Sequence, residues 1–157
     1  MTTTLLRDLR AALGADAVRD NTTELMLAGH DASNLVGRAG AICYPTTADE
    51  VRRIVDVCRA HGVPFVARGA GTGLAGGATP IGGAVVVCTT KMNRVLDVDP
   101  VARLAWVEPG VLNLDLTRHV SRWGLHFAPD PSSQQSCSIG GNVANNSGGP
   151  HCLAEGV

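Results

Sequence analysis

Residues 68–83 read RGAGTGLAGGATPIGG, so seven glycines fall between two short apolar runs. The runs VPFVA at 63–67 and AVVVC at 84–88 predict buried strands. Pro80 and the glycines exclude a long helix between them, because proline removes a backbone donor and glycine disfavours helical backbone. The segment therefore predicts strand, loop and strand, with the loop as its most distinctive part.

Within this loop, residues 71–76 read GTGLAG and match the G-x-G-x-x-G fingerprint of dinucleotide-binding folds, with Asp97 roughly 20 residues further on. That fingerprint requires a helix beginning inside the motif, since the helix N-terminus binds the pyrophosphate. Residues 77–83 contain Pro80 and cannot form this helix. The pattern therefore disfavours a Rossmann-type NAD site.

The composition of the loop still favours an anion-binding site. Glycines allow successive N–H groups to turn toward one concavity, and they let a phosphate approach without a Cβ in the way. Thr72 adds a hydroxyl and Arg68 a charge at the entrance, whereas Lys91 is the only lysine of the chain. Such a site would therefore depend on backbone amides. The alternative at this point is a flexible surface loop.

The residues before the loop predict a βαβ unit with parallel strands. Residues 39–45 form an apolar run ended by proline, and 63–67 form another. Between them, a capping box of Thr47 and Glu50 begins a helix whose apolar spacing continues to a left-handed stop at Gly62.

The residues after the loop predict a second group of elements. Residues 95–98 and 104–108 alternate in polarity around Asp99-Pro100 and predict a hairpin. Apolar residues at every fourth position from 112 to 120 predict a helix that Gly124 ends.

A second polar stretch, residues 129–149, reads PDPSSQQSCSIGGNVANNSGG. Its hydroxyl and amide groups suit a ligand with many hydroxyls and ring nitrogens, because each such group can donate and accept. Ile139 and Val143 predict partial burial and a short helix, which weakens the alternative of a solvated linker.

Charge and composition exclude several classes. Thirteen Lys+Arg against 14 Asp+Glu give a net charge of -1, and only 3% of residues are aromatic, so no nucleic-acid partner is expected. The sequence contains no apolar stretch of roughly 18 residues, so no membrane span is predicted. The N-terminal residues MTTTLLRDLR lack the features of a signal peptide, which favours a cytoplasmic location.

The five cysteines show no C-x-x-C spacing and are expected to be reduced thiols. Two histidines and two cysteines toward the C-terminus fit no usual spacing of metal ligands, so no metal site is predicted. These residues are His126, Cys137, His151 and Cys152.

Two stretches together carry a family resemblance. Residues 66–73, VARGAGTG, resemble the pyrophosphate loop of the FAD-binding domain in the vanillyl-alcohol oxidase and p-cresol methylhydroxylase (PCMH-type) superfamily. The segments PDPSS at 129–133 and CSIGGNVANNSGGPHC at 137–152 are similar to that family's second FAD-contacting stretch. Within the superfamily, the sequence most resembles the FAD-linked subunit of glycolate oxidase and its D-lactate dehydrogenase relatives. DAS at 31–33 and LDVDP at 96–100 also resemble that subgroup.

The resemblance implies an α+β fold, a PCMH-type FAD-binding domain with an N-terminal βαβ subdomain and an incomplete second α/β subdomain. Residues 1–38 would form an N-terminal helical and extended segment, and residues 39–157 the FAD-binding domain, truncated at its C-terminal end. In this family the groups that orient and deprotonate the substrate come largely from the part that would follow. No catalytic residue is therefore assigned in this chain.

The resemblance also implies which residues contact FAD. Non-covalent FAD is expected, because residues 69–71 are Gly-Ala-Gly where some covalent members use a histidine. The pyrophosphate would be wrapped, mainly by amides, by Arg68, Gly69, Ala70, Gly71, Thr72, Gly73 and Leu74. The adenosine and ribityl portions would be bordered by the stretch containing Pro131, Ser132 and Ser138. The ribityl chain and flavin would lie along Gly140, Gly141, Asn142, Asn146 and Gly148.

The implied function is FAD-dependent oxidation of a 2-hydroxy acid of the glycolate or D-lactate type, with hydride transfer to the flavin. Partner subunits that carry electrons onward are possible in such an enzyme. The alternative is a truncated, non-catalytic FAD-binding module that needs a partner polypeptide.

Overall fold

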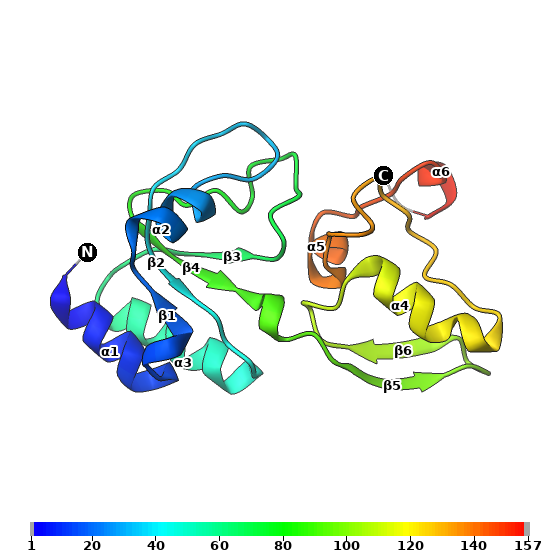
Figure 1. Cartoon of the computed structure of the whole chain (residues 1–157), viewed down its shortest axis with the longest axis horizontal. Coiled ribbons are helices and arrows are strands. Elements are labelled where there is room, and N and C mark those ends of the chain that lie inside the picture. Colours follow the sequence, from blue (N-terminus) through cyan, green and yellow to red (C-terminus); the bar gives the residue numbers. More distant parts are fainter. Residues whose placement is uncertain (1, 156–157) are drawn as a thin grey trace. The chain divides into compact units, whose positions relative to one another are not determined.

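The computed structural model describes residues 2–155 and contains two compact units, Met1–Lys91 and Met92–Val157 (Figure 1). Each unit has its own sheet and its own apolar core.

The first unit is built on a four-stranded sheet with the order β1-β2-β4-β3. The strands are β1 (Val18–Arg19), β2 (Ala39–Cys43), β3 (Phe65–Arg68) and β4 (Ala84–Cys88). β2 and β3 are both parallel to β4, and β1 is antiparallel to β2. The predicted strand–helix–strand unit is present, but β4 lies between its two strands. All residues of β4 are buried, which suits a central strand covered on both faces, whereas β3 at the edge is partly exposed.

Helices cover both faces of this sheet. Successive side chains of β4 point to opposite faces. Val85 and Val87 pack with α1 (Thr3–Leu13) and α3 (Ala48–Ala60), and Val86 packs on the other face with α2 (Thr22–Ala28). The N-terminal helices therefore complete the core of the first unit.

Local capping and glycine signals mark the helix boundaries of the first unit. α1 ends at Gly14 with a φ of 91°. At the start of α3, Thr47 Oγ1 accepts the N–H of Glu50 at 3.2 Å. The Glu50 carboxylate accepts the N–H of Thr46 at 2.6 Å, one residue before the partner expected in a capping box. Gly62 adopts a φ of 61° after the helix, as predicted.

The second unit contains the predicted hairpin, β5 (Val95–Asp99) and β6 (Leu104–Val107), paired antiparallel. The Asp99 carboxylate stabilises its turn by accepting the N–H groups of Val101 and Ala102, both at 2.9 Å. The apolar core of this unit gathers residues of the hairpin, of α4 (Asn113–Val120) and of α5 (Ile139–Ala144).

The remaining elements are short. They are α6 (Cys152–Glu155) and the 3-10 turns η1 (Ala15–Ala17), η2 (Thr89–Lys91) and η3 (Ser121–Trp123). Gly124 ends the α4–η3 segment with a φ of 69°, as predicted. Within residues 2–155, no helix has the length and apolar character needed to cross a membrane.

Candidate cofactor-binding site

Residues 69–83, here called the glycine loop, connect β3 to β4 without a helix or a strand. Gly71 and Gly76 have φ angles of 78° and 75°, in the left-handed region that residues with a Cβ disfavour. No helix begins inside the G-x-G-x-x-G motif in this described stretch, so the pyrophosphate site of a Rossmann fold cannot form here.

A continuous run of backbone donors in the glycine loop has no protein acceptor. Within residues 2–155, the N–H groups from Ala70 to Gly77 donate to no backbone or side-chain acceptor. The loop instead uses carbonyls for its own structure, since the Gly73 carbonyl accepts from Ala32 at 3.0 Å and the Gly76 carbonyl from Thr79 at 3.1 Å. A run of backbone donors without protein acceptors is the donor set that a phosphate satisfies. On this observation the loop fits the pyrophosphate of FAD.

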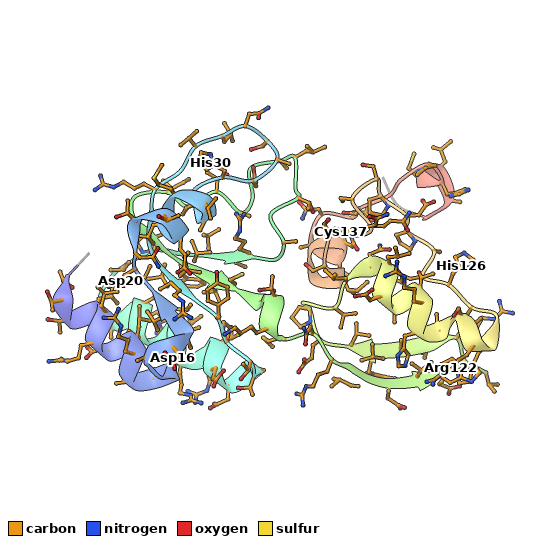
Figure 2. The ribbon with its side chains drawn as sticks, viewed as in Figure 1. Asp16, Asp20, His30, Arg122, His126 and Cys137 are labelled. Carbon is orange, nitrogen blue, oxygen red and sulfur yellow. The ribbon has the colours of Figure 1, made fainter. Side chains whose placement is uncertain are left out.

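Arg68, at the end of β3, is engaged in holding the loop. Its Nη1 donates to the carbonyl oxygen of His30 at 2.6 Å, and Figure 2 labels His30 beyond the end of α2. The guanidinium also occupies the space beside Gly71, where a Cβ atom would collide with it. The sequence suggests Arg68 as a charge at the entrance of the site, and the structure adds a role in shaping the glycine loop.

In the second unit, Asn142 of α5 is almost completely buried, at 5% exposure. Its Oδ1 accepts from Asn113 Nδ2 at 3.0 Å, and its Nδ2 donates to Cys137 Sγ at 3.3 Å. Figure 2 labels Cys137 beside α5. The Asn142 side chain therefore ties α5 to α4 and to the preceding polar stretch, which leaves it buried away from solvent.

Asn113 is a residue that the sequence analysis does not single out. It is 1% exposed, and its Nδ2 also donates to the carbonyl of Pro129 at 2.9 Å. A signal for it exists, because an asparagine stands beside Leu112 at the start of the apolar helix pattern. Buried amides are normally hydrogen-bonded, so such a position indicates a structural network.

The other predicted residues of the second unit have varied surroundings. The N–H of Gly140 donates to the Pro109 carbonyl at 2.9 Å, and a Cβ on Gly140 would lie 2.7 Å from the Pro109 Cβ. Asn146 is exposed with a φ of 48°. Val143 is 75% exposed, so the predicted partial burial of this residue is wrong. Among the rest, Ser138 and Gly148 are buried, Pro131 and Gly141 are half-buried, and Ser132 is exposed.

Two cysteines and one histidine are candidate reactive groups of the described chain. Burial raises the pKa of Cys43 to about 12 and also raises the pKa of Cys58, which makes both thiols inert. His151 Nδ1 lies 2.9 Å from Asp130 Oδ2, at the surface. In the part of the chain that the structure describes, no three His, Cys, Asp or Glu residues are grouped so as to hold a metal ion.

Comparison with known proteins defines the class of this chain. Residues 39–157 match the family described as FAD binding domain, so the chain belongs to that family. The fold is shared by a solved structure of alkyldihydroxyacetonephosphate synthase, with a TM-score of 0.88 at 22% identity, covering 99% of this chain and 31% of that one. It is also shared by p-cresol methylhydroxylase, with a TM-score of 0.82 at 23% identity, covering 92% and 29%. The predicted PCMH-type fold and the FAD-binding class are therefore confirmed.

Relatives in sequence include a glycolate oxidase subunit and a D-lactate dehydrogenase. The chain is 48% identical over 116 residues to "Glycolate oxidase subunit GlcD" of Escherichia coli (strain K12), which covers 74% of this chain and 23% of the relative. It is 36% identical over 129 residues to "D-lactate dehydrogenase" of Anaerostipes hadrus, covering 81% and 27%. The chain thus spans about a quarter of the length of these relatives.

Proposed function

We propose that this chain holds non-covalent FAD for the oxidation of a 2-hydroxy acid of the glycolate or D-lactate type. The observation that carries the proposal is the run of backbone N–H groups from Ala70 to Gly77 that has no acceptor within the described residues. Such donors can offset the negative charge of a pyrophosphate. The similarity to a glycolate oxidase subunit and to a D-lactate dehydrogenase supports the substrate class.

When bound, FAD supplies the flavin ring that accepts a hydride from the substrate carbon bearing the hydroxyl group. The part of this chain is to bind and orient the cofactor. The amides of the glycine loop offset the charge of the pyrophosphate, and Arg68 keeps the loop in shape through His30. The Asn113–Asn142 hydrogen bond fixes α5, which carries three of the predicted residues, against α4. No residue of this chain is assigned as the base.

We also propose partner subunits and a cellular location for this chain. A relative is described as a subunit, which supports partner subunits that carry electrons onward. All five cysteines are free thiols, which supports a reducing, cytoplasmic environment.

The direct test is titration of the purified chain with FAD, followed by flavin fluorescence and by calorimetry. We expect saturable binding of one FAD per chain, with competition by ADP because it carries the same pyrophosphate. Absence of binding up to millimolar FAD would show that this chain by itself does not hold the cofactor.

A second candidate function is an FAD-binding module that acts only with a completing polypeptide. The specific observation is an apolar cavity of about 1030 Å³ within the second unit, between the hairpin and the helices. Leu104 and Trp106 on its wall are 53% and 52% exposed. A two-stranded hairpin is marginally stable when its apolar side chains remain exposed, so a covering segment would stabilise it.

Co-expression distinguishes the two functions. The polypeptide to be tested is the portion of a GlcD relative that lies beyond its match to this chain. If FAD binds only to the co-expressed pair, the completing-polypeptide function holds, whereas equal FAD affinity with and without the second polypeptide favours the first proposal.

A further inference from the structure

The segment of residues 30–38, here called the strap, follows α2 and runs beside the glycine loop (Figure 1). Two contacts join its first half to the end of β3 and to the loop. The His30 carbonyl accepts from Arg68 Nη1 at 2.6 Å, and the N–H of Ala32 donates to the Gly73 carbonyl at 3.0 Å.

The other end of the strap is joined to the end of the loop. The N–H of Arg38 donates to the Pro80 carbonyl at 2.9 Å. Gly37 passes so close that a Cβ atom there would lie 2.7 Å from Thr79 Cγ2 and would collide with the Pro80 carbonyl. The loop is therefore held by the strap near both of its ends.

Asp31 organises the strap internally. Its Oδ1 accepts the Ser33 hydroxyl at 2.5 Å and the Ser33 N–H at 2.9 Å. The pKa of Asp31 is lowered mainly by the Ser33 hydroxyl, with smaller contributions from the backbone N–H groups of Ser33 and Ala78 and from the charge of Arg68. Asp31 is thus hydrogen-bonded within the strap, while the Ala78 N–H and the Arg68 charge also favour its ionised form.

Leu35 contacts the middle of the glycine loop. A Cβ atom at Gly76 would lie 2.6 Å from Leu35 Cδ1, so the Leu35 side chain lies directly against the Gly76 backbone. The contact adds a packing constraint between the two segments at a point between the hydrogen-bonded ends of the loop.

We propose that the strap preorganises the glycine loop for its anion, with Asp31 and Gly37 as positioning residues that do not touch the cofactor. This inference rests on the proposed function of the loop as a pyrophosphate site. The reason is entropic, because ordering a flexible chain costs conformational entropy, and glycine loses the most freedom. A loop that is already ordered does not incur this cost when it binds FAD.

The test measures loop order and FAD affinity separately. In the ligand-free chain, ¹⁵N relaxation should give order parameters near the rigid value of about 0.85 for the amides of 70–77, and values below about 0.6 in Asp31→Ala and Gly37→Ala. We expect the FAD dissociation constant of these two variants to rise on the order of tenfold, the equivalent of ordering about one residue on binding.

Two further variants act as controls. Asp31→Asn keeps an acceptor oxygen and should retain the loop order that Asp31→Ala loses. Val36→Ala changes a strap side chain that is 75% exposed and should leave both measurements unchanged. Unchanged chemical shifts for the strands and helices of the first unit, outside the strap and the glycine loop, show that each variant is folded.

The outcomes separate the two proposals. A mobile loop in the wild-type chain, or a loop that stays rigid in both Asp31→Ala and Gly37→Ala, would overturn the inference. Unchanged FAD affinity in a variant whose loop has become mobile would overturn it as well. If the wild-type chain binds no FAD, the proposed function fails, and the order parameters still decide whether the strap holds the loop.

Discussion

The guanidinium group of Arg68 lies in the space that a Cβ atom at Gly71 would enter. The same guanidinium donates to the His30 carbonyl, so one side chain links β3, the strap and the glycine loop. Gly71 is therefore required twice, once for its positive φ and once for its lack of a side chain. This relationship makes the conformation of the loop sensitive to a single methyl group.

Gly71→Ala should abolish most FAD binding. The methyl group displaces Arg68 and reorients neighbouring amides, and the loss of two amide–phosphate hydrogen bonds, each worth about 1.5 kcal/mol, lowers affinity on the order of a hundredfold. The matched control is Gly62→Ala, which has a similar φ of 61° but open space around the added Cβ. Both variants should lose about 1–2 kcal/mol of stability from left-handed backbone strain, and only the first should lose FAD in a fluorescence titration. Equal FAD affinity in the two variants would contradict the role given to the loop.

Asn142→Ala should destabilise the chain by about 1–3 kcal/mol, because it removes one of the two hydrogen bonds that the buried Asn113 amide donates. Urea unfolding followed by circular dichroism measures this loss. Asn145→Ala is the matched control, since Asn145 is exposed on the same helix end, and its effect should stay within about 0.5 kcal/mol. If Asn142→Ala kept the wild-type stability but lost FAD binding, the result would instead favour direct contact of Asn142 with the cofactor.

Stability should fall in acid partly through Glu108. Its carboxylate accepts Arg94 Nη2 at 2.7 Å and the Arg94 N–H at 2.8 Å, and the Arg94 side chain is the main cause that lowers the pKa of Glu108 below the usual 4.5. Because the folded pKa is lowered, the carboxylate contributes stability above about pH 4.5, and this contribution is lost as the pH falls through the lowered pKa. Glu108→Gln should therefore show a flatter decrease in unfolding free energy between pH 5 and pH 3, approximately the range in which carboxyl groups titrate. An unchanged slope would show that the ion pair contributes nothing to acid sensitivity.

The apolar cavity of the second unit should bind a hydrophobic dye. We expect anilinonaphthalene sulfonate fluorescence with the folded chain and a clear reduction in Trp106→Gln, since Trp106 lines the cavity. Trp123→Gln is the control, because Trp123 is also partly exposed but stacks with Arg122 outside the cavity lining. Equal dye binding by the two variants would place the dye elsewhere and remove support for a covering segment.

Much of the fold could be predicted from local patterns. The apolar run of β4, the helix stop at Gly62 and the hairpin around Asp99 all follow from residues within a few positions of one another. The glycine loop is likewise a local feature, since Pro80 and its glycines exclude a helix wherever the loop lies in the fold. The family resemblance extends the prediction to FAD.

The rest depended on contacts between distant residues. The sequence predicts two parallel strands joined by a helix, but it does not say that β4 inserts between them. The prediction of partial burial for Val143 failed because burial depends on what packs against a helix, which a short polar stretch does not specify.

By itself, the sequence determined the local elements and an anion-binding composition, because helix caps, apolar periodicity and positive φ act over a few residues. Only the tertiary structure decided the role of Arg68, whose partner His30 is 38 residues away, and the pairing of Asn113 with Asn142, 29 residues apart. A hydrogen bond across such a separation forms only once the strands and helices have packed, so no local pattern in the chain records it.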